Sequence, residues 1–228
     1  MDARSIDGLL FWFPAFVFST TVHEAAHAWS ALKGGDPTAY HGGQVSLSPL
    51  PHIRREPIGM LVLPLLTAAT NGWAIGWASA PFDPVWAAQH PRRAGLMAAA
   101  GPVANALLAL AAWAAIKGGM AAGAFVPSEY MSAASLVVPA AGQAAGFVAF
   151  AAKALSVMLS LNTLLAVFNL LPVPPLDGSA VVDLVAPIGY ARMLRRLGPA
   201  GSFLGLLVAW KVFPFVVAPV LRFVAATI

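Results

Sequence analysis

Two histidines and a glutamate lie close together near the N-terminus, in the string His23-Glu24-Ala25-Ala26-His27. Residues four apart on an α-helix project from the same face, so both imidazoles could bind one metal ion. Glu24 could then act as general base toward a water molecule that the metal activates. The alternative is that the imidazoles only pack their polar edges between helices. We favour the metal site, because ionisable groups in apolar helices are costly and usually functional.

A catalytic zinc site needs a third protein ligand and an open position for water. Asp177 is the strongest candidate, because it follows a long apolar run and lies in the proline-rich turn 172–178. Prolines break the helix and restrict the backbone, so a carboxylate in this turn can be held in one direction. The alternative role for Asp177 is to cap a helix that begins at Gly178.

Other residues of ligand type are weaker candidates. Three histidines lie in polar connections, where a surface or interfacial position is the favoured interpretation, and one aspartate lies beyond the turn: His41, His52, His90 and Asp183. The chain has no cysteine, which excludes thiolate ligands and disulfide bonds.

The surroundings of these residues are strongly apolar. The chain of 228 residues is 59% hydrophobic and 10% charged, with a mean hydropathy of +0.77. Soluble domains contain about 25% charged residues, so the composition predicts a polytopic helical membrane protein. The net charge of +4 is small, and the basic residues form short clusters. We therefore expect no nucleic-acid binding and interpret the clusters as topology signals.

Five apolar stretches are candidates for membrane helices: 8–32, 57–70, 94–116, 144–171 and 199–226. The first lacks a basic region and a cleavage pattern, so we expect a retained helix rather than a signal peptide. The second is shorter than the roughly 20 residues that a crossing helix needs, and a Gly- and Trp-containing run follows it to Pro81. The alternating run Gln44–Ser48 predicts a short strand or hairpin at the membrane surface.

The predicted fold is all-α and polytopic, with about four to five transmembrane helices, a re-entrant segment and a short β-hairpin or strand. We expect one domain over residues 1–228, with a core at 8–185 and a C-terminal transmembrane helix at 199–226.

A shared metal ion constrains the topology, because the ends of the first and fourth stretches must then lie on one side of the membrane. This holds if Pro57–Pro81 dips in and returns without crossing. The metal side then collects eight basic residues: Lys33, Arg54, Arg55, Arg92, Arg93, Arg192, Arg195 and Arg196. The other side collects three: Arg4, Lys117 and Arg222. The positive-inside rule predicts a multi-pass protein whose metal site faces the cytoplasm.

Three motifs together resemble the site-2 protease family of intramembrane zinc metalloproteases. They are HEAAH in the first apolar stretch, GPVAN at 101–105 and NLLPVPPLDG at 169–178, and the resemblance extends over about residues 9–185. It implies a compact family member without a PDZ insertion, in a bacterial cell membrane, acting on a transmembrane protein or peptide. It leaves the oligomeric state open.

The resemblance also implies roles for single residues. His23, His27 and Asp177 would bind one Zn²⁺ per chain, and Glu24 would be the general base. Asn169 would hold the substrate backbone or polarise the scissile carbonyl, with a helix-capping or interhelical hydrogen bond as the alternative.

Substrate-path residues follow from the same resemblance, through the segments Gln44–His52 and Gly76-Trp77. They are Gln44, Val45, Ser46 and Trp77. Two other classes of function remain open: an inactive zinc-binding membrane scaffold, and a small ion transporter that uses the same ionisable groups.

Overall fold

The structure is a computed structural model that describes residues 3–142, 146–185 and 196–228. Within these residues, four helices are long and apolar enough to cross a membrane: Ser5–Gly34, Pro91–Ala121, Phe147–Asn169 and Gly198–Ala226. They coincide with four of the five apolar stretches, so the chain is a polytopic helical membrane protein. Arg192 and Arg195, which entered the charge count, lie outside the described residues.

The first long helix carries the two histidines in its last turns. It runs without interruption through α1 (Ala3–Asp7), the π-helical turn η1 (Gly8–Trp12) and α2 (Phe13–Gly34). It ends where Gly35 adopts a left-handed φ of 99°, with the Asp36 N–H donating to Ala31 O. His27 lies seven residues before Gly34, so it sits about 10 Å from this end of the helix.

Short helices connect α2 to the next long helix. They are α3 (Thr38–His41), α4 (Pro49–Arg55), the π-helical turn η2 (Ile58–Val62) continued by α5 (Leu63–Asn71), and α6 (Pro84–Gln89).

The strand predicted at Gln44–Ser48 does not form. Ser46 Oγ accepts a hydrogen bond from the Ser48 N–H, and Ser48 Oγ accepts one from the Leu50 N–H. These local bonds turn the chain into α4 and take up backbone groups that a strand would use. The prediction of strand at this position was therefore wrong.

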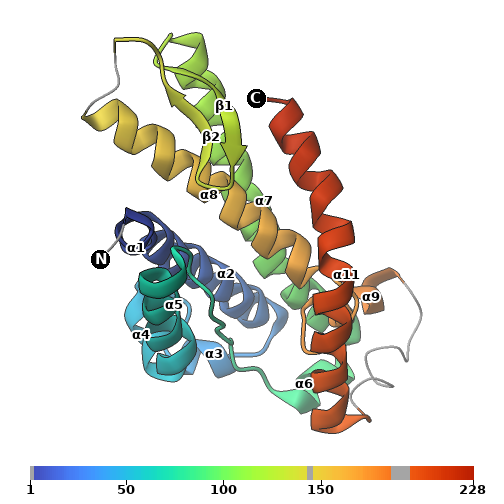
Figure 1. Ribbon diagram of the computed structural model, residues 1–228. Helices are drawn as coiled ribbons and strands as arrows, with labels where there is room; N and C mark the ends of the chain where they lie inside the picture. The colour runs from blue at the N-terminus through green and yellow to red at the C-terminus, as the bar shows by residue number, and fades with distance from the viewer. Residues whose placement is uncertain (1–2, 143–145, 186–195) are drawn as a thin grey trace.

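The segment from Glu56 to Ser79 folds back on itself, so that its two ends lie in contact. Its helix, Ile58–Asn71, ends at Gly72 in a left-handed turn with φ 78°, and an extended chain then runs back (Figure 1). Ser79 Oγ donates to Glu56 Oε1 at 2.7 Å, and the Trp77 N–H donates to Gly59 O at 3.1 Å. This return is the geometry expected of a re-entrant segment.

The β-hairpin of the fold lies elsewhere, after the second long helix. Strands β1 (Phe125–Ser132) and β2 (Ser135–Pro139) pair antiparallel and follow α7 (Pro91–Ala121). The hairpin lies beside α7 and α8 (Phe147–Asn169), at the end of the molecule far from α6 (Figure 1). Ser156 Oγ of α8 accepts a hydrogen bond from the Leu136 N–H of β2, which fixes the hairpin to the helix.

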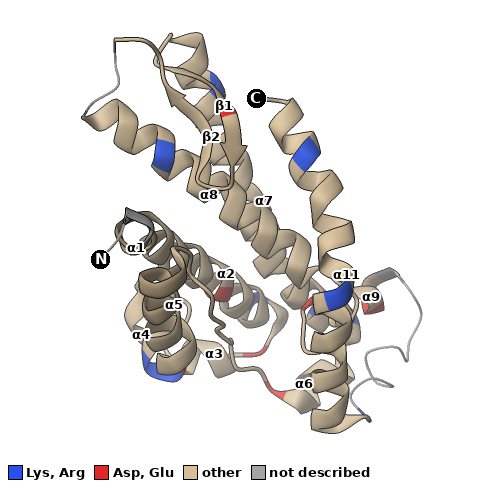
Figure 2. Ribbon diagram, viewed as in Figure 1, with Lys and Arg blue, Asp and Glu red and all other residues tan. Residues whose placement is uncertain are grey.

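Polar contacts between the long helices show how the helices are oriented in the bundle. At one end, Lys153 of α8 pairs with Asp7, and Lys117 of α7 donates to the Thr227 carbonyl beyond α11 (Gly198–Ala226). Helices α2 and α8 therefore begin at this end, where α7 and α11 finish. The long helices themselves carry few charges (Figure 2). The C-terminal ends of α2 and α8 thus meet at the opposite end, as a shared metal ion requires.

Asp36 holds the connection after α2 together. Its side chain is 1% exposed; Oδ1 accepts from the Thr38 N–H at 2.9 Å and Oδ2 accepts from the Asp83 N–H at 2.8 Å. Burial raises the pKa of this carboxyl, but the hydrogen bonds from Thr38 and Asp83 outweigh burial and hold the pKa below its usual range.

We expect Asp36→Asn to lower the free energy of unfolding by about 1–3 kcal/mol, because the amide turns one acceptor into a donor that faces an N–H. Because the folded pKa is depressed, this stabilisation is present above about pH 4 and is lost as the pH falls through the folded pKa. Thermal unfolding in detergent across pH measures it. Asp83→Asn is the control, since asparagine caps the Val85 N–H as well as aspartate does. Equal stability of the two variants would contradict the role of Asp36.

Candidate metal centre

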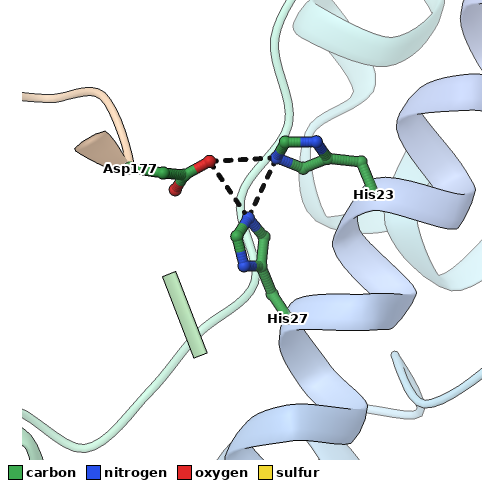
Figure 3. Close-up of side chains that lie close together, drawn as sticks. All are labelled: His23, His27 and Asp177. Atoms are coloured by element: carbon green, nitrogen blue, oxygen red, sulfur yellow. Dashed lines mark hydrogen bonds and ion pairs between the residues drawn. The ribbon is translucent and has the colours of Figure 1, made fainter. Parts of the chain in front are cut away.

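The three expected metal ligands come together in the structure. Asp177 Oδ2 lies 3.1 Å from His23 Nε2 and 3.3 Å from His27 Nε2, and the two Nε2 atoms are 2.9 Å apart (Figure 3). A tetrahedral zinc ion with ligands at 2.0–2.1 Å separates neighbouring ligand atoms by roughly 3.3 Å. The observed triangle of donor atoms therefore has the size that zinc needs.

Both imidazoles present a lone pair to the centre of this triangle. His27 Nδ1 lies 2.7 Å from the Met97 carbonyl, which can only accept, so Nδ1 carries the proton and Nε2 is free to bind a metal. The same assignment for His23 depends on Asn105, whose Oδ1 contacts His23 Nδ1.

A buried amide network orients Asn105. Asn162 Nδ2 donates to the Met158 carbonyl at 2.9 Å and to Ser19 Oγ, which leaves Asn162 Oδ1 as an acceptor. Asn105 Nδ2 donates to that oxygen at 2.8 Å, so Asn105 Oδ1 must accept from His23 Nδ1. Both asparagines are completely buried. With both Nδ1 atoms protonated, two lone pairs and a carboxylate face one another, and this arrangement needs a cation between them.

Gly101 of α7 makes room at the centre. A Cβ at this position would collide with Nε2 of both His23 and His27. The backbone of α7 thus approaches the two Nε2 atoms closely, and only glycine leaves that space open.

Asp177 reaches the imidazoles from the turn between α8 and α9 (Gly178–Val185). Its backbone oxygen accepts from the Ala180 and Val181 N–H groups, while its side chain points to the histidines rather than capping α9. A carboxylate that binds a metal is ionised, so its two oxygens can only accept or coordinate.

Helix α11 packs against this turn. A Cβ at Gly205 would collide with the Pro174 carbonyl, and Ala209 packs with Leu171 and Leu176. The last long helix thus supports the turn that presents Asp177.

A cleft of about 580 Å³ opens beside the ligands. Helix α2 contributes Phe16, Thr20, His23 and Glu24 to its walls, α8 contributes Leu165, Phe168 and Asn169, and the returning chain contributes 75–79. Glu24 is 5% exposed, and its Oε2 has no hydrogen-bond partner in the described part of the chain. Glu24 thus lines the cleft one residue from His23, and one of its carboxylate oxygens is buried without a partner among the described residues.

Two of the other expected site residues line the cleft. Asn169 and Trp77 line it, and Asn169 Nδ2 also donates to the Leu165 carbonyl of its own helix at 3.0 Å. Gln44 does not line it; this residue is 1% exposed, and its Nε2 donates to Ser79 O. Val45 and Ser46 line a separate depression against the Ala25 side of α2.

The weaker ligand candidates lie away from the centre. His52 is buried rather than at the surface, and its Nε2 contacts Ser46 O at 3.0 Å. His41 is exposed, and His90 Nδ1 contacts the Trp86 carbonyl. Asp183 lies in α9 and is outside the ligand cluster.

Sequence reasoning did not assign a role to Gly101, Asn105, Asn162 or Ser19. The first two lie in the GPVAN string, and an asparagine in an apolar helix is itself a signal of a polar contact between helices. Which atom each amide contacts depends on the packing of α2, α7 and α8 and could not be read from spacing.

We expect Gly101→Ala to abolish metal binding, because the added methyl group occupies the space between the two Nε2 atoms. Metal analysis of the purified protein should find close to no zinc. Gly118→Ala in the same helix is the matched control, since a Cβ there has nothing within 4 Å, and it should keep its zinc. Full zinc content in Gly101→Ala would contradict the assigned centre.

Comparisons with known proteins agree with this geometry. Peptidase family M50, which comprises the site-2 proteases, matches residues 11–210. A Bacillus subtilis (strain 168) protein named "Putative zinc metalloprotease YwhC" is 36% identical over 181 residues, which cover 78% of this chain and 71% of that protein. No solved structure matches the chain. The extent of the family match shows that this chain belongs to peptidase family M50.

Proposed function

We propose that this membrane metalloprotease hydrolyses peptide bonds within or near the transmembrane segments of other membrane proteins. One zinc ion per chain would be held by His23, His27 and Asp177. The single observation that carries the proposal is the triangle of His23, His27 and Asp177 beside a cleft that Glu24 also lines. A bound zinc ion supplies Lewis-acid activation of water and of a peptide carbonyl.

Glu24 is the general base in this proposal. Its carboxylate takes a proton from the attacking water and later passes that proton to the leaving amine. The position of Glu24 supports this role, since it lies next to His23 in sequence and lines the same cleft as Asp177.

Asn169 and the returning chain would hold the substrate. A helical substrate hides its carbonyls, so cleavage needs a locally extended peptide whose backbone finds new hydrogen-bond partners. Asn169 has one amide hydrogen left beyond its bond to Leu165 O, and the run 75–79 with Trp77 lines the same cleft. Gln44 would act indirectly through its bond to Ser79 O. Contacts of Val45 and Ser46 with substrate stay a prediction.

We expect Glu24→Gln to keep its zinc and to lose cleavage of a single-span membrane substrate by about 10²–10⁴-fold, the usual contribution of a general base. The zinc content of the purified variant is measured by metal analysis. Cleavage is measured in proteoliposomes, and the substrates are single-span proteins that the variant captures from the membrane. Unchanged cleavage would exclude Glu24 as the base.

Assays of the wild-type protein separate the other two classes of function. An inactive scaffold would bind zinc but cleave nothing even with Glu24 present. A transporter would carry an ion flux across vesicles that contain the wild-type protein.

We further propose that the metal centre opens toward the cytoplasm of a bacterial cell. The chain has no cysteine, so single cysteines can report the side on which a position lies. Ala88→Cys in α6 marks the metal end of the bundle, and Ala133→Cys in the hairpin marks the other end; both positions are exposed.

An impermeant maleimide should label Ala133→Cys in intact cells and Ala88→Cys only after permeabilisation. Labelling of both from one side would contradict a membrane crossing by α7, which is the long helix between the two positions, and the reverse pattern would contradict the orientation.

A further inference from the structure

Thr20 of α2 carries a buried hydroxyl that the fold does not use. The residue is 7% exposed, and its Oγ1 has no hydrogen-bond partner among the described residues. Threonines in other apolar helices here donate to the carbonyl four residues earlier: Thr67 to Leu63 at 2.9 Å, Thr70 to Leu66 at 2.9 Å and Thr163 to Leu159 at 2.7 Å. Thr20 does not make this local bond.

Packing does not explain a hydroxyl at this position. A buried hydroxyl without a partner lowers stability, and valine would fill the same volume without that cost. A bound molecule could supply the missing partner wherever such a residue lines a cleft.

The position of Thr20 points to that partner. Thr20 lies one helical turn before Glu24 and lines the same cleft as the metal ligands. On the α2 wall of this cleft, Phe16 is apolar, an ionised Glu24 can only accept, and the N–H of His23 is bonded to Asn105. Thr20 is thus the side chain on this wall that can donate a hydrogen bond to a molecule in the cleft.

We propose that the Thr20 hydroxyl contacts substrate directly and donates a hydrogen bond to a peptide carbonyl next to the scissile bond. This proposal rests on the proposed function. An extended peptide in an apolar cleft needs donors for its carbonyls, and Thr20 of α2 and Asn169 of α8 would supply them.

Thr20→Val tests the contact, with Thr21→Val as a matched control. Thr21 is 1% exposed and its hydroxyl also has no partner among the described residues, but it does not line the cleft. Thr20→Val should raise KM and lower kcat/KM about three- to tenfold, the worth of one hydrogen bond. Thr20→Ser should restore both values, and Thr21→Val should match wild type. All three variants should keep wild-type zinc content, and the two valine variants should unfold at or above the wild-type temperature.

Binding gives a readout that does not depend on turnover. In the Glu24→Gln background, adding Thr20→Val should weaken binding of a captured single-span substrate by a similar factor, and adding Thr21→Val should not. Equal behaviour of Thr20→Val and Thr21→Val in both assays would overturn the contact, as would loss of zinc from Thr20→Val. A shifted pH profile with unchanged KM would assign the hydroxyl to Glu24 instead and equally overturn it.

The two proposals fail in different ways. If the wild-type protein binds the single-span peptide but never cleaves it, the proposed function is overturned. The binding assay then still tests whether Thr20 contacts the bound peptide.

Discussion

The hydrogen bonds at the Nδ1 atoms of His23 and His27 are the constraint on which the whole centre depends. Met97 O and Asn105 Oδ1 accept these protons, so both Nε2 lone pairs are directed at the Asp177 carboxylate. Each acceptor is itself fixed by helix packing, because Met97 and Asn105 both belong to α7. The packing of α7 against α2 therefore sets the protonation of the ligands as well as their positions.

The candidate ligands could be picked out from sequence because each is marked by the residues next to it. A helix brings His23 and His27 to one face, and the prolines before Asp177 end α8 and expose a carboxylate. The supporting contacts could not be predicted, since Asn105 meets His23 across 82 positions and Asn162 across 57. Amide orientation and the space left by Gly101 follow from how three helices pack, which no periodicity encodes.

The prediction of the fold was right where the length of an apolar stretch determines the structure. It was wrong where hydrogen bonds between nearby residues determine it. The long apolar stretches became helices, and the short one returned on itself at Gly72. The alternation at Gln44–Ser48 resembled a strand, but serine side chains there bond to nearby backbone and start α4 instead. The hairpin formed at 125–139, where Val137 and Phe125 are buried beside α8 and Ser156 supplies an acceptor.

The distance in sequence between the ligands has a consequence for folding. His23 and Asp177 are separated by 154 positions, so an ion bound to both would close a loop that contains most of the bundle. Closing a long loop removes many conformations from the unfolded chain, much as a covalent cross-link does. In a chain without a single cysteine, the metal would thus act as a cross-link between its first and last thirds, and assembly of the bundle would be completed by the ion.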